Sequence, residues 1–169
     1  MAGSSTAELR LRPTRDDDVD YVVAAESHAD NAPYLAPSPA AVHRAFMQDP
    51  EQRHLVAEVD GRRVGFVLLR RHAESRAVEL RRIAVTEKGR GYGRAALRAA
   101  VALAFEDPEA HRVWLDVKPH NERARALYRS EGFVEEGTLR DALWHGGRFE
   151  SLVVMSILRP EWTSCGGTP

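Results

Sequence analysis

Cysteine is almost absent from this 169-residue sequence, which contains only Cys165. A single cysteine cannot form an intramolecular disulfide or a cysteine-based zinc cluster. It lies in a stretch rich in serine, glycine, threonine and proline, where we expect an exposed thiol without a catalytic role. No metal site is expected either, because metal-ligand spacing with carboxylates or with each other is missing for five of the histidines: His28, His43, His54, His72 and His111.

Long apolar runs and an excess of one charge are also missing. No segment approaches the roughly 20 apolar residues that a membrane-spanning helix needs, and the first residues lack the basic and apolar regions of a signal peptide. The 24 basic and 25 acidic residues give a net charge of −1. This balance argues against a dedicated nucleic-acid binder, whose phosphate contacts need a basic face. We therefore expect a cytoplasmic protein with neither a membrane nor a nucleic-acid partner.

The composition that remains is typical of one globular domain. The apolar fraction of 43% and the charged fraction of 29% suit a chain that builds its own core. Both ends are rich in small and polar residues. We therefore expect a disordered tail at residues 1–7, a single domain at residues 8–160 and a flexible tail at residues 161–169.

The period of the apolar residues changes several times along the domain. Alternating and β-rich runs predict seven strands, at residues 8–12, 54–59, 64–72, 77–85, 111–117, 133–139 and 150–158. Spacings of three and four and helix-start signals predict four helices, after Asp18 and at residues 39–48, 92–105 and 122–130. This order predicts a mixed α/β fold with one crossover unit rather than a long doubly wound sheet.

A glycine-rich turn between a strand and a helix is the central motif, Lys88-Gly-Arg-Gly-Tyr-Gly-Arg94. Glycine permits positive φ and lets a ligand approach the peptide groups. The free N–H groups at the start of the helix and the positive end of its dipole favour an anion. Arg90 and Arg94 add positive charge at the same place, so a pyrophosphate is the natural occupant.

The same turn has three other interpretations. A Walker A loop would end in Gly-Lys-Ser/Thr, whereas Gly93 is followed by an Arg-Ala pair, so that interpretation fails. The spacing of Gly91, Gly93 and Ala96 matches the dinucleotide fingerprint, and Asp116 falls near the end of the next strand. That alternative stays open on the motif alone, although several strands precede the turn. A turn that only reverses the chain is the third interpretation.

Two blocks of sequence resemble a known family. The segment Glu79–Val85 with the glycine-rich turn resembles the core motif of GNAT acetyltransferases, Gln/Arg-x-x-Gly-x-Gly/Ala, with Lys88 at the position of Gln or Arg. The segment 121–133 resembles the family's next motif, Asn-x-x-Ala-x-x-Leu-Tyr-x-x-x-Gly-Phe. The segment 136–158 resembles, more loosely, the subgroup that includes ribosomal-protein N-terminal acetyltransferases. The resemblance implies the GNAT fold, a mostly antiparallel seven-stranded sheet flanked by about four helices.

The resemblance also implies acetyl-CoA as co-substrate. Its pantetheine arm would pair with the main chain of the strand that ends at Val85, as though it were an added strand, and its pyrophosphate would lie in the glycine-rich turn. The residues implied for cofactor binding are Ile83, Ala84, Val85, Lys88, Arg90, Gly91, Tyr92, Gly93, Arg94, Ala95, Asn121 and Tyr128.

Acetyl transfer from a thioester to an amine requires proton movements. An alkylamine has a pKa of about 10.4 and must lose a proton before it attacks. The resemblance implies Tyr128 as the general acid for the leaving thiolate; the alternative is a packed tyrosine whose hydroxyl only binds the cofactor. Glu79 is the candidate general base, because alternation would place residues 79, 81, 83 and 85 on one strand face near the acyl group. The alternative is a solvated residue at a strand end.

The acceptor pocket is the part with the weakest signal. Tyr34 and Leu35 of the proline-rich loop 31–39, and Trp144 near the last turn, are its expected walls. The expected acceptor is a primary amine of a small molecule or of a protein or peptide, which attacks directly in a ternary complex. Dimers are common in the family, so a homodimer is one expected assembly. A non-catalytic acyl-CoA-binding sensor or regulatory module is the alternative function.

Overall fold

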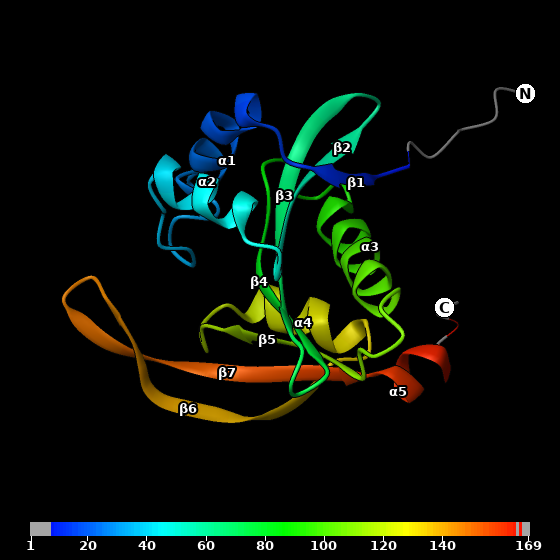
Figure 1. Ribbon diagram of the computed structural model, residues 1–169. Coiled ribbons are helices and arrows are strands. Elements are labelled where there is room, and N and C mark those ends of the chain that lie inside the picture. Colours follow the sequence, from blue (N-terminus) through cyan, green and yellow to red (C-terminus); the bar gives the residue numbers. More distant parts are fainter. Residues whose placement is uncertain (1–7, 165, 167–169) are drawn as a thin grey trace, which may run out of the picture.

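A single mixed sheet forms the centre of the computed structural model, which describes residues 8–164 and 166 (Figure 1). Its seven strands follow the order β1-β2-β3-β4-β5-β7-β6. Neighbouring strands are antiparallel except β4 and β5, which are parallel. The mixed α/β fold with a mostly antiparallel seven-stranded sheet is therefore confirmed. The strands are β1 (Arg10–Pro13), β2 (Gln52–Val59), β3 (Arg62–His72), β4 (Ala77–Val85), β5 (Arg112–Val117), β6 (Val134–His145) and β7 (Arg148–Leu158).

Helices cover both faces of the sheet. Within the described residues they are the 3-10 helix η1 (Asp16–Asp18) and the α-helices α1 (Val19–Glu26), α2 (Ala40–Gln48), α3 (Tyr92–Phe105), α4 (Glu122–Ser130) and α5 (Arg159–Ser164). α1 and α2 lie on one side of the central strands and α3 on the other (Figure 1). The buried apolar residues divide in the same way. One cluster joins the sheet to α1, and a larger one joins its other face to α3 and α4.

The chain end is more ordered than its composition indicates. Residues 161–164, expected to begin a tail, belong to α5. The ring of Trp162 packs on Phe105, with 5.0 Å between centroids. The Arg159 guanidinium donates hydrogen bonds to the carbonyl oxygens of Phe105, Asp107 and Ala110. These contacts hold α5 against the end of α3. The remaining tail residues, 1–7, 165 and 167–169, lie outside the described residues.

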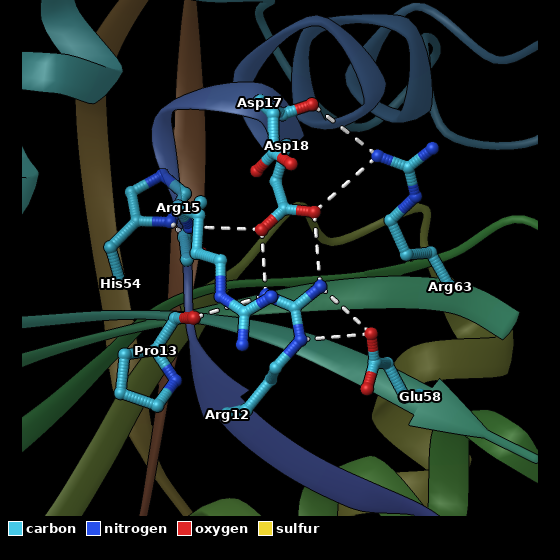
Figure 2. A network of polar contacts seen from close by, with 9 residues as sticks. Arg12, Pro13, Arg15, Asp17, Asp18, His54, Glu58 and Arg63 are labelled. Atoms are coloured by element: carbon cyan, nitrogen blue, oxygen red, sulfur yellow. Dashed lines mark hydrogen bonds and ion pairs between the residues drawn. The ribbon is translucent and has the colours of Figure 1, made fainter. Parts of the chain in front are cut away.

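An ion-pair network fixes the start of α1 (Figure 2). Arg12 on β1 donates to both carboxylate oxygens of Asp18 at 2.6 and 3.0 Å, and to Glu58 on β2 at 2.8 Å. The Asp18 carboxylate also accepts the backbone N–H of Arg15 at 2.9 Å. The hydrogen bond from Arg12, together with that from Arg15, lowers the pKa of Asp18 to about 2, although burial opposes the shift. The three acids at residues 16–18 are thus anchored to the sheet edge through Asp18.

β4 and β5 separate soon after they meet. They pair at three positions only, and the last pair joins Glu79 to Trp114. β4 then continues to Val85 and β5 to Val117 without a ladder between them. Because β4 keeps β3 as its partner on one edge only, its other edge forms no strand ladder beyond Glu79. This divergence opens a cleft between the two strands.

A β-bulge in β4 changes which side chains share a face. Leu69 pairs with Leu80, but Leu68 pairs with Arg82, so Arg81 is an extra residue. Leu80 and Ile83 consequently both pack toward α3, while Ala84 packs toward α1. The expectation that residue 79 shares a face with residues 83 and 85 is therefore wrong. Glu79, between two residues that face α3, lies on the α1 side of the sheet.

A chain of buried polar groups crosses the α1 side. The Nε2 atom of His54 lies 3.0 Å from Nδ1 of His43, and its Nδ1 lies 2.8 Å from the Thr14 hydroxyl. Nε2 of His43 lies 3.3 Å from the Glu26 carboxylate, which is also paired with Arg82. Burial penalises the charged ring, and His43 adds to this effect, so the pKa of His54 is lowered to about 4.

His54 is expected to make the fold sensitive to acid. In the unfolded chain the pKa of this histidine is near the ordinary value of 6.5, so the unfolded chain binds more protons as the pH falls toward 4. The free energy of unfolding should therefore fall by about 2 kcal/mol between roughly pH 7.5 and pH 5 through this one group. Urea unfolding at a series of pH values measures the slope. His54→Gln should flatten it relative to the exposed control His111→Gln; an unchanged slope would contradict this assignment.

Candidate functional site

A cleft of about 980 Å³ opens where β4 and β5 separate. Its walls come from these two strands, the start of α3, one face of α4, the loop between α1 and α2, and the β6–β7 hairpin. The volume is at the upper end of the range of small-molecule sites. The sites expected for donor and acceptor thus belong to one continuous cavity.

The glycine-rich turn forms one end of this cleft. Gly91 is the N-cap of α3, in the left-handed region with φ of +79°, and no side chain caps the helix. The first hydrogen bond of the helix runs from Ala95 N to Gly91 O at 3.0 Å. The preceding N–H groups, including those of Tyr92 and Gly93, therefore have no intrahelical acceptor. An anion placed there would meet these N–H groups and the positive end of the helix dipole.

The cationic side chains around the turn differ in their partners. Arg94 pairs with Glu131, and Arg90 lies 3.9 Å from Glu87. Lys88 lies in the cleft wall, where burial and the charge of Arg123 lower its pKa. Lys88 and Arg123 are therefore the charges best placed to face a phosphate inside the cleft. Of the predicted cofactor residues, three lie outside the cleft lining: Ala84, Arg90 and Ala95.

Asn31 is a site residue that the sequence analysis missed. Its side-chain amide donates to the carbonyl oxygens of Ala25 at 2.9 Å and Val85 at 3.2 Å, and its oxygen accepts from Lys88 at 2.7 Å. It thereby joins the end of α1, the end of β4 and the glycine-rich turn. The sequence around Asn31 indicates only a loop, because two of these partners are more than 50 residues away.

Tyr128 lies on α4, lines the cleft and belongs to the larger apolar cluster. Its side chain is buried, and its ring packs on Phe133 with 5.9 Å between centroids. Burial raises the pKa of Tyr128, and the negative charge of Asp116 raises it further. The phenol therefore keeps its proton at neutral pH, as a proton donor must. Asn121, expected to contact the cofactor, also lines the cleft, and its oxygen caps α4 by accepting Ala124 N–H at 3.2 Å.

Two carboxylates stand at the point where the strands part. Glu79 belongs to the last β4–β5 pair; its carboxylate lies 3.0 Å from His72 Nε2 and 3.9 Å from Arg81 Nε. Asp116 is two residues beyond Trp114, the partner of Glu79, and so lies on the same face of the sheet. Desolvation and then the charge of Glu79 raise the pKa of Asp116, while Arg81 opposes the shift. The sequence indicates Asp116 only as part of a dinucleotide-binding fingerprint.

The α1–α2 loop and the β6–β7 hairpin form the part of the cleft where the sequence predicts the acceptor. Tyr34 and Leu35 line the cleft, and their contact with an acceptor stays a prediction. The prediction for Trp144 is wrong: this side chain is 62% exposed and packs on Phe149 outside the lining. Its neighbour Leu143 lines the cleft instead, because successive side chains of a strand point to opposite faces.

Lys118 ties these elements together at the end of β5. Its ammonium group is buried and lies 2.8 Å from the Glu150 carboxylate, 3.2 Å from Nδ1 of His145 and 3.4 Å from the carbonyl oxygen of Pro33. The hydrogen bond from Lys118, with another from Arg148, lowers the pKa of Glu150 to about 2. Lys118 thus fixes the hairpin and the loop relative to the sheet.

Other kinds of site are not seen in the described part of the chain. No cluster of three or more His, Cys, Asp or Glu residues there could hold a metal ion. None of its helices is both long and apolar enough to cross a membrane.

Comparison with known proteins identifies the family. A profile of the Acetyltransferase (GNAT) family matches residues 19–133. The spermidine N(1)-acetyltransferase of Escherichia coli (strain K12) is 27% identical over 177 aligned positions, which cover 98% of this chain and 94% of that protein. A Bacillus subtilis (strain 168) protein, YdaF, whose name assigns it provisionally to the ribosomal N-acetyltransferases, is 40% identical over 80 residues, 47% of this chain and 44% of its own length.

The fold comparison agrees with the sequence comparison. The structure of a Vibrio cholerae spermidine N-acetyltransferase in complex with CoA and spermine superposes with a TM-score of 0.81 at 24% identity, covering 92% of this chain and 98% of that one. The chain therefore belongs to the GNAT acetyltransferase family and is an acetyl-CoA-dependent acyltransferase that acts on amines.

Proposed function

We propose that the protein transfers the acetyl group of acetyl-CoA to a primary amine of a small molecule or peptide, by direct attack in a ternary complex. The continuity of the cleft carries this proposal. The cleft runs from the glycine-rich turn at Gly91, where a pyrophosphate would bind, to the opening lined by Tyr128, Glu79 and Asp116. Tyr34 of the α1–α2 loop forms another part of its wall. Both substrates therefore have room in one cavity, and no acyl-enzyme intermediate is needed.

The open edge of β4 suits the donor. A pantetheine arm has amide groups that can pair with the free backbone groups beyond Glu79, as an added strand would. The thioester would then lie between β4 and β5. Tyr128 approaches from the helix α4, while the acceptor enters from the face that carries Glu79 and the α1–α2 loop. A free N–H of the β4 edge can stabilise the oxyanion formed on attack.

The proton balance assigns a role to each polar group. The amine nitrogen forms a bond to the thioester carbon, and the carbonyl electron pair moves to oxygen. Glu79 takes a proton from the attacking nitrogen, the carbon–sulfur bond breaks, and the Tyr128 hydroxyl gives its proton to the thiolate. The products are the acetylated amine and CoA, with one proton released to solvent for each ammonium ion consumed.

The relatives guide the choice of acceptors for the test. The Escherichia coli relative is a spermidine acetyltransferase, and the Vibrio cholerae structure contains spermine. The purified protein with acetyl-CoA should therefore be offered spermidine, spermine, short diamines, amino sugars and N-terminal peptides, with CoA thiol release as the readout. We expect release that depends on one class of primary amine and a melting temperature raised by acetyl-CoA.

The same experiment separates the alternatives. A non-catalytic sensor would show the rise in melting temperature without thiol release from any acceptor. A dinucleotide-binding protein would change the fluorescence of NADH on titration and would not respond to acetyl-CoA. Thiol release without an amine would indicate hydrolysis and would contradict direct transfer to an acceptor.

A further inference from the structure

Within the described part of the chain, Asp116 differs from the other acids of the cleft in having no ion-pair or side-chain hydrogen-bond partner. Four acidic residues line the cleft: Asp30, Glu79, Glu87 and Asp116. Glu79 lies near His72 and Arg81, Glu87 near Arg62 and Arg90, and Asp30 lies 3.9 Å from His28. Within residues 8–164 and 166, Asp116 alone of these four makes no ion pair or side-chain hydrogen bond. Its carboxylate is thus free to accept a positively charged ligand.

The position of Asp116 indicates what that ligand is. It lies on the same face of β5 as Trp114, two residues beyond the last β4–β5 pair, where the two strands have begun to part. The apolar side chains of Leu143 and Leu152 line the same cavity. Tyr128 is near enough across the opening for the charge of Asp116 to raise its pKa. A group that reaches Asp116 is therefore close to the place where the thioester would lie.

We infer that Asp116 binds the ammonium group of the acceptor and takes its first proton, so that the amine becomes nucleophilic at the thioester. This inference rests on the proposed function and deepens it. An ammonium ion must lose two protons to become an amide N–H, one before attack and one after it. Asp116 takes the first, and the proton then passes to solvent at the open end of the cleft. Glu79 takes the second, after the nitrogen–carbon bond has formed.

The charges around Asp116 favour this order. Glu79 and Arg81 face it from β4, Tyr128 faces it from α4, and Lys118 follows directly after β5. Lys118 is neutralised by Glu150, so it does not compete for Asp116. Desolvation in the cleft and the charge of Glu79 raise the pKa of Asp116, which makes it a stronger base than an ordinary aspartate, while its side chain stays exposed to a ligand. The neighbouring Glu79 also adds a second negative charge that attracts a cation to this point.

The test compares Asp116→Asn with a matched substitution outside the cleft, Asp141→Asn, on the exposed part of β6. With the best ammonium acceptor from the amine panel, Asp116→Asn should lower kcat/KM for the amine by about 100-fold or more, with the acetyl-CoA Kd and melting temperature unchanged. Asp141→Asn should leave all three unchanged. A β-fluorinated analogue of the same acceptor, neutral at the assay pH, needs no first deprotonation. With this analogue, Asp116→Asn should lower kcat/KM by less than about tenfold.

The outcomes distinguish failure of the role of Asp116 from failure of the proposed acetyl transfer. An active wild-type protein with a fully active Asp116→Asn variant would overturn the role of Asp116 alone. Equal losses with the ammonium and the fluorinated acceptor would also overturn it, because they would indicate a general defect of the site. A wild-type protein that binds acetyl-CoA but releases no thiol with any amine would overturn the proposed function and, with it, this role.

Discussion

Tyr128→Phe is expected to lower kcat by about 10²- to 10³-fold while the affinity for acetyl-CoA stays within about twofold. The ring of Tyr128 packs on Phe133 in a buried position, and phenylalanine keeps that packing. What is lost is the hydroxyl, which stays protonated at neutral pH because burial raises its pKa. Without it the thiolate must leave unprotonated. Steady-state kinetics with CoA release, and calorimetric titration of acetyl-CoA, measure the two quantities.

Tyr21→Phe supplies the control for loss of a tyrosine hydroxyl elsewhere. Tyr21 is partly buried on α1, its hydroxyl lies 3.3 Å from Thr86 Oγ1, and it does not line the cleft. This variant should keep its kcat even if its stability falls. A Tyr128→Phe variant with full kcat would show that Tyr128 is not the acid. An equal loss of kcat and of acetyl-CoA affinity would instead indicate that the hydroxyl only binds the cofactor.

The features that the sequence predicts well depend on local signals. The expected ranges of α3 and α4 agree with the structure to the residue. α3 begins at a glycine in the left-handed region, and α4 begins at Asn121, whose side chain caps it. Both signals are contained within a few residues of the helix start. The sequence therefore places the glycine-rich turn correctly at a helix N-terminus.

The features that the sequence does not predict depend on distant partners. The bulge at Arg81 arises from the register between β3 and β4, and the Leu-Arg-Arg sequence itself gives no sign of it. The place of Trp144 depends on the irregular pairing of β6 with β7, where the register shifts between Leu139 and Leu143. Lys118 and Asn31 acquire their roles from residues far along the chain. The sequence around such residues is that of an ordinary loop or strand and does not indicate their roles.

The cofactor end and the chemical end of the cleft can be separated by mutation. Gly91→Val is expected to raise the acetyl-CoA Kd by about 100-fold, which corresponds to about 3 kcal/mol. A β-branched residue is strained at the φ of +79° found there. Relief of that strain would rotate the peptide groups that start α3, and two hydrogen bonds to a charged pyrophosphate, each contributing about 1.5 kcal/mol, would be lost. Calorimetric titration with acetyl-CoA and with CoA measures the effect.

Gly61→Val is the matched control because Gly61 has nearly the same conformation in a different place. Its φ is +74°, and a Cβ at either glycine would have no atom within 4 Å, so both variants carry strain without a clash. Both should therefore lose a similar free energy of unfolding, on the order of 1–2 kcal/mol. Gly61 lies in the β2–β3 turn outside the cleft, so only Gly91→Val should lose acetyl-CoA affinity. Equal affinities in the two variants would mean that the N-terminus of α3 does not hold the pyrophosphate, and the donor would then have to be bound through the open edge of β4 alone.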